Sequence, residues 1–275
     1  RVGKCMPGHV KVFDPTTGEQ VPIQELYERQ QANVLTMNSE FKINPSKSSH
    51  VWDNGIKEVF KVTLKSGRVV EATGNHPLYR IDGWTEIDDL AIGDRIATPR
   101  IINHFGSKYM SDEELAQLED LTQASELTKE RMQHLLQRYF TSYEAHNINE
   151  ENARFLQHAL LRFGIQANIA KEDTWSVIIP ANMYEQTQYA LFNNQKAYSE
   201  HTWSANHYAE EVFRLEKEGR LQSTSLLHPN ASMLSEREPV SSKTKHHALS
   251  LNRIKSLTNS DIYWDEIVSI ESQGD

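Results

Sequence analysis

Val59-Phe-Lys-Val-Thr-Leu64 and Arg68-Val-Val-Glu-Ala-Thr73 are two strand-like runs, and Lys65-Ser-Gly67 joins them. Two such runs around a short glycine-containing turn predict a β-hairpin. The second run leads directly into Thr73-Gly-Asn-His76, which is followed by Pro77-Leu-Tyr79. A Thr and a His at this spacing recur by chance, so the meaning of the pattern depends on the rest of the chain.

The residues around this hairpin predict more short strands. Within residues 5–100, Gly and Pro punctuate several apolar runs, and Val21 to Leu26 offers a short helix or turn. The predicted strands are Val10-Lys-Val-Phe13, Val34-Leu-Thr-Met37 and the end of Gly93-Asp94-Arg-Ile-Ala-Thr-Pro99. Many short strands of this kind indicate an antiparallel β-fold.

The pattern becomes helical beyond Ser107. Apolar residues at helical spacing and capping residues predict helices, and a strand pair follows them. The expected elements are helices from Ser111, over Leu127–Phe140, Asn149–Phe163 and His201–Lys217, strands Ile165–Ile169 and Trp175–Ile179, and a mobile loop over 219–247. Strand character returns from Ile262 to Ile270. The order predicts an α/β segment inserted in a β-domain.

Composition narrows the class of protein. The chain has 275 residues, a formal net charge of -9 and one cysteine, Cys5. Net negative charge argues against broad attraction to nucleic acids or anionic membranes. One cysteine excludes internal disulfides and cysteine-based zinc sites, and no apolar run approaches the ~20 residues of a membrane helix. We expect a cytoplasmic setting.

Three motifs occur in order along the chain. Cys5-Met-Pro-Gly-His9 heads the β-domain, Thr73-Gly-Asn-His76 ends the hairpin, and Leu90-Ala-Ile-Gly-Asp94-Arg-Ile-Ala-Thr-Pro99 follows. A lone cysteine is more often a small buried apolar residue than a nucleophile. The combination instead resembles the N-terminal splicing pattern of inteins, and it is similar to the inteins of replicative DNA helicases.

The resemblance implies an α+β fold, in which a mainly-β, horseshoe-like antiparallel Hint splicing domain holds an inserted α/β endonuclease-like domain. Ile262 to Ile270 resembles the strand that re-enters the splicing domain. The implied domains are residues 1–4 as the end of the N-extein, 5–106 with 261–275 as the splicing domain, and 107–260 as the insert.

The resemblance also assigns chemical roles. Cys5 would carry out an N-to-S acyl shift on the Lys4–Cys5 bond, because a thiol forms a usable nucleophile near neutral pH. His76 would protonate the leaving amide nitrogen, since an ordinary histidine exchanges protons near pH 7. Thr73 and Asn75 would assist by hydrogen bonding around the scissile bond. No cofactor and no metal ion is implied.

Two nearby residues invite structural interpretations. Asp94 follows Gly93 and is interpreted as a turn-forming residue rather than a catalyst. His9 stands where many inteins have Asp, which puts the family's local hydrogen bonding at this position in doubt.

Complete inteins end in His-Asn, and the Asn cyclises to release the C-extein. This sequence ends at Ser272-Gln-Gly-Asp275, before any such motif. We therefore expect the first splicing step alone, and a complementary C-terminal intein fragment as partner. A split intein is favoured over a chain shortened by design or proteolysis. Gly3-Lys4 matches the end of a phosphate-binding loop, which suggests a P-loop ATPase such as a replicative helicase as the flanking exteins.

The insert resembles a LAGLIDADG homing endonuclease that has lost its acidic motif ends. Glu119, Asp120 and Glu144 are the remaining acidic candidates, and they are interpreted as solvated helix residues rather than metal ligands. His246-His247 are likewise interpreted as surface residues. Two alternative functions stay open, a homing endonuclease that cleaves DNA and an inactive Hint-like binding module.

Overall fold

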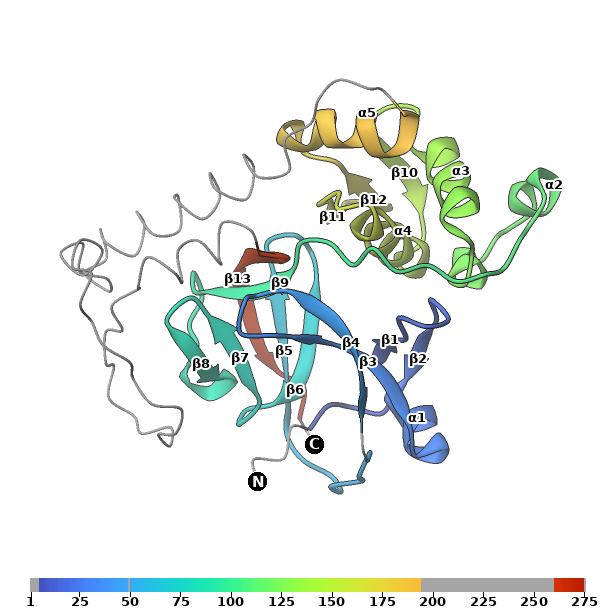
Figure 1. The fold of residues 1–275 in the computed structure, drawn as a ribbon. Helices are drawn as coiled ribbons and strands as arrows, with labels where there is room; N and C mark the ends of the chain where they lie inside the picture. Colours follow the sequence, from blue (N-terminus) through green and yellow to red (C-terminus); the bar gives the residue numbers. More distant parts are fainter. Residues whose placement is uncertain (1–4, 49, 194–259, 275) are drawn as a thin grey trace.

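A computed structural model describes residues 5–48, 50–193 and 260–274. Two parts are distinguished within them (Figure 1). The β region comprises residues 5–106 with 260–274, and the inserted unit comprises residues 107–193. No helix in these described ranges is both long and apolar enough to cross a membrane.

The β region is built from short antiparallel strand pairs. Its elements are β1 (Lys11–Phe13), β2 (Gln20–Pro22), α1 (Ile23–Arg29), β3 (Ala32–Met37), β4 (Ile43–Ser48), β5 (Val59–Leu64), β6 (Val69–Thr73), β7 (Pro77–Arg80), β8 (Gly83–Glu86), the 3-10 helix η1 (Ile87–Asp89), β9 (Arg95–Pro99) and β13 (Ile262–Ser272). The hairpin predicted around Lys65-Ser-Gly67 is confirmed, and Val59 pairs with Thr73 at its open end. Strands β2, β4, β7 and β8 were not predicted, because they are short, polar or contain Pro and show little alternation.

The strand predicted to return to the β-domain is confirmed as β13. It lies inside a four-stranded sheet of order β6-β5-β13-β9. Its first half pairs with β9 and its second half with β5, with a register shift between Ile267 and Ser269. The buried Asp265 on β13 accepts hydrogen bonds from the hydroxyl and the backbone N–H of Ser66. β13 therefore joins the two halves of the β region.

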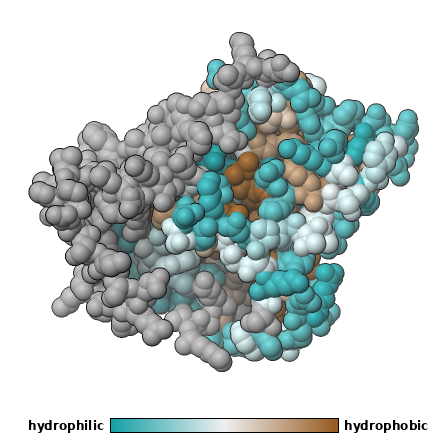
Figure 2. Space-filling model, viewed as in Figure 1, coloured by the Kyte–Doolittle hydropathy of each residue, from teal (hydrophilic) through white to brown (hydrophobic). Residues whose placement is uncertain are grey.

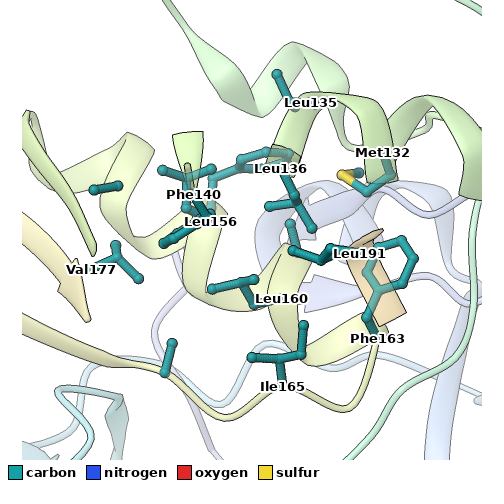
Figure 3. Close-up of a cluster of buried hydrophobic side chains, with 14 of the residues drawn as sticks. Met132, Leu135, Leu136, Phe140, Leu156, Leu160, Phe163, Ile165, Val177 and Leu191 are labelled. Carbon is teal, nitrogen blue, oxygen red and sulfur yellow. The ribbon is translucent and has the colours of Figure 1, made fainter. Parts of the chain in front are cut away.

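The inserted unit has its own apolar core. Its elements are α2 (Asp112–Ala116), η2 (Leu121–Ala124), α3 (Lys129–Tyr139), β10 (Glu144–Ile148), α4 (Glu150–Arg162), β11 (Asn168–Lys171), β12 (Trp175–Ile178), η3 (Ala181–Met183) and α5 (Tyr184–Phe192). Figure 3 shows residues such as Leu136, Leu156, Leu160 and Leu191 directed toward one another. The capping box at the start of α2 is confirmed, because Ser111 and Glu114 exchange both hydrogen bonds.

Secondary structure in this unit differs from the prediction in at least three places. The strand predicted over Ile165–Ile169 is β11, which covers Asn168–Lys171. Glu144–Ile148 forms a strand, β10, in a sheet of order β10-β12-β11, and α5 was not expected. β10 was missed because Glu-Ala-His-Asn-Ile is mostly polar. The predicted helix over His201–Lys217, the loop over 219–247 and His246-His247 lie outside the described residues.

Helix α4 connects the two parts through polar side chains. The buried Arg162 guanidinium donates to the carbonyl oxygens of Ser125 and Gly18, both at 2.7 Å, and lies 4.8 Å from the centre of the Phe13 ring. Gln157 donates to the carbonyl of Ser66 at 2.8 Å. These buried polar contacts therefore link the inserted unit to the β region. On the face seen in Figure 2, hydrophilic residues of the described part surround a smaller hydrophobic area.

Gly106 lies between the two parts at a point of close approach. A Cβ atom there would lie 2.0 Å from the carbonyl oxygen of Glu126 and 2.3 Å from that of Thr17. Both of these oxygens belong to the backbone and cannot rotate away from a methyl group. We therefore expect Gly106→Ala to lower the free energy of unfolding by about 3 kcal/mol or more. Urea unfolding measures this change. Gly8→Ala is the control, because its Cβ would lie no nearer than 3.3 Å to any atom of Gln24. Equal effects at both sites would contradict the argument.

The pH dependence of stability should depend on His158 in α4. Its ring lies 5.0 Å from the ring of Phe13. Burial, together with the positive charges of Arg162 and Arg68, holds the pKa of His158 well below its ordinary value. The unfolded chain therefore takes up a proton as the pH falls below ~6.5, whereas the folded chain does not. Stability should fall by about 1.4 kcal/mol per pH unit in this window.

Urea unfolding of wild type and His158→Gln, at neutral pH and one unit below ~6.5, tests this expectation. The variant should lose stability less steeply with falling pH. His50→Gln, at an exposed histidine, is the matched control and should retain the wild-type slope. Identical slopes for wild type and His158→Gln would show that His158 is protonated in the folded chain.

Candidate active site

Cys5 is half-buried at the edge of the β5–β6 hairpin. Its carbonyl oxygen accepts a hydrogen bond of 3.1 Å from the backbone N–H of Thr73, the last residue of β6. The lone cysteine and the first residue of the Thr-x-x-His pattern are therefore in backbone contact, although they are far apart in the sequence.

The residues Thr73 to His76 form a tight turn. The N–H of His76 donates to the carbonyl of Thr73 at 2.8 Å. The buried Thr73 donates its hydroxyl hydrogen to Oδ1 of Asn75 at 2.7 Å. This contact leaves the Asn75 amide nitrogen, a donor, directed away from Thr73. The turn thus carries a hydroxyl, an amide and an imidazole on residues that directly follow or include the one that contacts the Cys5 backbone.

The 3-10 helix η1 donates two backbone hydrogen bonds to this turn. The N–H of Ile87 donates to the carbonyl of His76 at 3.1 Å, and the N–H of Asp88 donates to that of Gly74 at 2.9 Å. A Cβ at Gly74 would lie 2.0 Å from Oδ1 of Asp88. The Gly of the motif therefore permits the close approach that holds the turn against η1.

A residue that sequence reasoning missed contacts the sulfur of Cys5. The side-chain amide of Asn54, in the loop between β4 and β5, lies 3.1 Å from Sγ with its nitrogen as donor. Asp53-Asn54-Gly55 signals a turn in the sequence, but no local signal shows that this turn reaches Cys5.

The two neighbouring residues singled out in the sequence have other partners. His9 is exposed, and its Nε2 lies 2.6 Å from Oε2 of Glu71. The Asp94 carboxylate accepts a hydrogen bond of 3.0 Å from the N–H of Ala91 and lies 3.5 Å from the Arg80 guanidinium. These contacts agree with a turn-forming role for Asp94.

The acidic candidates of the inserted unit make local contacts. Asp120 accepts hydrogen bonds from the backbone and the hydroxyl of Thr122, which cap η2 and lower the pKa of Asp120. Glu144 lies 2.9 Å from Nε2 of His146. Among the residues that the structure describes, no three His, Cys, Asp or Glu side chains gather where they could hold a metal ion.

Cys5, Thr73, Asn75 and His76 are thus arranged at one place, and Lys4 lies outside the described residues. A family model described as the intein splicing domain matches residues 13–275 of the chain. The chain belongs to the intein splicing domain family. The match includes the Thr-x-x-His turn and β13 of this intein, and it begins after Cys5. Protein splicing, a self-processing activity, is the function of the family in general terms.

Replicative DNA helicases are among the relatives of the chain. The intein is 31% identical over 200 residues to the replicative DNA helicase DnaB of Synechocystis sp., covering 71% of the chain and 21% of the helicase. It is 34% identical over 119 residues to DnaB of Rhodothermus marinus, covering 43% and 12%. A crystal structure of a DnaB intein from Synechocystis sp. shares 30% identity, covers 36% of this chain and 70% of its own, and gives a TM-score of 0.35. The chain therefore spans about a fifth or less of the helicases that it matches.

The predicted fold class is confirmed. The intein is α+β, with antiparallel strand pairs throughout the β region and helices concentrated in the inserted unit.

Proposed function

We propose that this intein carries out the first step of protein splicing, in which Cys5 moves the acyl group of Lys4 from its own nitrogen to its sulfur. The observation that carries the proposal is the hydrogen bond between the Thr73 N–H and the Cys5 carbonyl. It brings the only cysteine of the chain against the Thr-x-x-His turn, although the two lie 68 positions apart in the sequence.

The step balances as an intramolecular acyl transfer. The Cys5 thiol loses its proton, and the thiolate attacks the carbonyl carbon of Lys4 to form a tetrahedral oxyanion. The bond from that carbon to the Cys5 nitrogen then breaks, and His76 supplies the proton that the nitrogen needs to leave. The products are a thioester to Cys5 Sγ and a free amine on Cys5.

Thr73 and Asn75 would assist this step as a hydrogen-bonded pair. The Thr73 hydroxyl holds Oδ1 of Asn75, which fixes the direction of the Asn75 amide. An amide donor held in advance stabilises developing negative charge without reorganisation during the reaction. We assign Asn75 this donor role, and we assign Thr73 the role of orienting Asn75 and the Cys5 backbone.

A C-terminal segment or fragment with His-Asn would complete splicing. The carbonyl of Gly274 accepts from Val59 N–H at 3.1 Å, Val59 pairs with Thr73, and Thr73 contacts Cys5. Each step between neighbouring strands spans ~5 Å, so a segment following Gly274 would begin within about 15 Å of Cys5. The proposal is the same whether these residues follow in the same chain or come from a complementary C-terminal intein fragment.

The flanking exteins would be parts of a P-loop ATPase such as a replicative helicase. Gly3-Lys4 matches the end of a phosphate-binding loop, and the relatives include helicases named DnaB. Splicing would then join that Lys to a Ser or Thr of the loop and restore it.

We further propose that 5–106 with 261–275 is the splicing domain, and that 107–260 is an endonuclease-like insert without nuclease activity. The local contacts of Asp120 and Glu144 support this, since each carboxylate is engaged with a residue two positions away rather than with a second acidic candidate. Incubation of the chain with DNA and magnesium tests it. Nicking above the level of a buffer control would contradict it and favour the endonuclease alternative.

The intact mass of the chain with a longer leader before Cys5, after incubation with dithiothreitol or hydroxylamine, tests the acyl shift. Loss of everything before Cys5 is expected, because both nucleophiles cleave a thioester. The same incubation with a synthetic C-terminal fragment reveals whether that fragment is needed to assemble the site. No loss in either incubation would favour the inactive binding module.

A further inference from the structure

We infer that Asn54 is a catalytic residue of this intein, which stabilises the Cys5 sulfur whenever the sulfur carries negative charge. The inference rests on the proposed function of Cys5. The contact that carries it is the Asn54 Nδ2 to Cys5 Sγ distance of 3.1 Å, with the amide as donor. The contact is between side chains of residues 49 positions apart in the sequence, so it depends on the folded path of the chain and not on local sequence.

The loop that carries Asn54 has a defined path. Val51 packs against the cluster of Val21, Leu26 and Ala32 beneath α1. The N–H of Gly55 then donates to Oδ1 of Asp53 at 2.8 Å, which closes an Asx turn around Asn54. Gly55 has a φ of 70°, a conformation that glycine adopts without strain. An anchored start and a closed turn therefore direct the Asn54 side chain toward Cys5.

Negative charge resides on the Cys5 sulfur at two points of the chemistry. The thiol must lose its proton to solvent before the thiolate attacks Lys4. When an external thiolate later attacks the thioester carbonyl, the carbon–sulfur bond breaks and Cys5 leaves as a thiolate. A neutral thiol is a weak hydrogen-bond acceptor, whereas a thiolate accepts a charge-assisted bond. The Asn54 amide therefore favours the charged sulfur at both points.

Two factors limit how much the alkylation rate of Cys5 should fall when the Asn54 amide is removed. Asn54 is exposed, so water replaces part of the lost hydrogen bond in a variant. A more basic thiolate is also intrinsically more nucleophilic, which offsets part of the loss in thiolate population. We therefore expect Asn54→Leu to slow Cys5 alkylation roughly three- to tenfold at neutral pH.

The first arm of the test measures the rate of Cys5 alkylation by iodoacetamide in the full chain. Asn54→Leu keeps the size of the side chain and removes the donor. Asn54→Asp places an acceptor against the sulfur, so its rate should fall further. In both variants, the curve of alkylation rate against pH should be displaced to higher pH than in the wild type. Asp53 and His76, the titratable residues beside Asn54 and in the Thr-x-x-His turn, are unchanged in every variant.

Ile56→Ala is the matched control, because Ile56 is 86% exposed in the same loop. It should alkylate at the wild-type rate, whereas a general loosening of the loop would affect it as well. Equal rates and equal pH profiles for wild type and Asn54→Leu would overturn the inference.

The second arm measures thiol-induced release of the leader by intact mass, and it separates this inference from the proposed function. Release that depends on Cys5 but proceeds at the wild-type rate in Asn54→Leu would overturn the role of Asn54 and leave the acyl shift standing. If Asn54→Leu is alkylated more slowly than the wild type, but the wild type itself never releases its leader, the contact is supported and the acyl shift is contradicted. Slower alkylation together with slower release supports both.

Discussion

Replacement of Cys5 by alanine is expected to abolish thiol-induced release of the leader. Alanine offers no nucleophile, so no thioester forms and dithiothreitol has no bond to cleave. Intact mass over the time in which the wild-type chain loses its leader completely would show only the uncleaved variant. Because Cys5 contacts Thr73 through backbone atoms, alanine keeps the same hydrogen bond. The fold and the association with a C-terminal fragment should therefore be retained.

Two further measurements make this result specific. Circular dichroism and urea unfolding of Cys5→Ala should match the wild type, which excludes loss of activity through unfolding. Cys5→Ser should release its leader far more slowly, since a hydroxyl is a much weaker nucleophile near neutral pH. Release from Cys5→Ala at the wild-type rate would disprove the mechanism, because the bond would then be cleaved by another group.

Replacement of His76 by alanine is expected to slow release by ~10²-fold or more, the usual effect of losing a general acid. An amide nitrogen that leaves without a proton would depart as a strongly basic anion. The backbone of His76 also holds the turn, since its N–H and carbonyl bond to Thr73 and Ile87. His76→Gln keeps these contacts and a polar side chain but cannot donate an acidic proton, so it should be nearly as slow as His76→Ala.

The rate of leader release by intact mass measures this effect, and His146→Ala is the control. His146 is an exposed histidine of the inserted unit, paired with Glu144, and should have no influence on the rate. Full activity in His76→Gln would assign the proton transfer to another group. Slow release in His146→Ala as well would instead indicate a general effect of histidine loss on the fold.

Local sequence patterns predicted much of the secondary structure. The hairpin β5–β6, the capping box at Ser111 and the strand β13 were all expected from patterns within a few residues. These elements are stabilised largely by local turn and capping interactions or by alternating apolar residues, which is why a short window suffices. Strands β4, β7, β8 and β10 lack such alternation, and their pairing depends on neighbouring strands instead.

Four residues of the candidate site were predicted from the sequence, and the folded structure added a fifth, Asn54. Cys5, Thr73, Asn75 and His76 were recognisable because three motifs occur in order along the chain. Their roles remain predictions that the variants above test. Asn54 carried no such signal, because a turn sequence specifies the bend of a loop and not the group that the loop reaches.

The family, the residue types of the Thr-x-x-His turn and the order of a β region interrupted by an α/β unit all followed from sequence patterns. The contact of Asn54 with the Cys5 sulfur, and the hydrogen bonds from Arg162 in α4 to Gly18 and Ser125, became visible in the folded chain alone. The physical reason is the range of the interactions. Capping, turn formation and strand alternation act between residues close in sequence, whereas side-chain contacts across the fold exist only after the elements have packed.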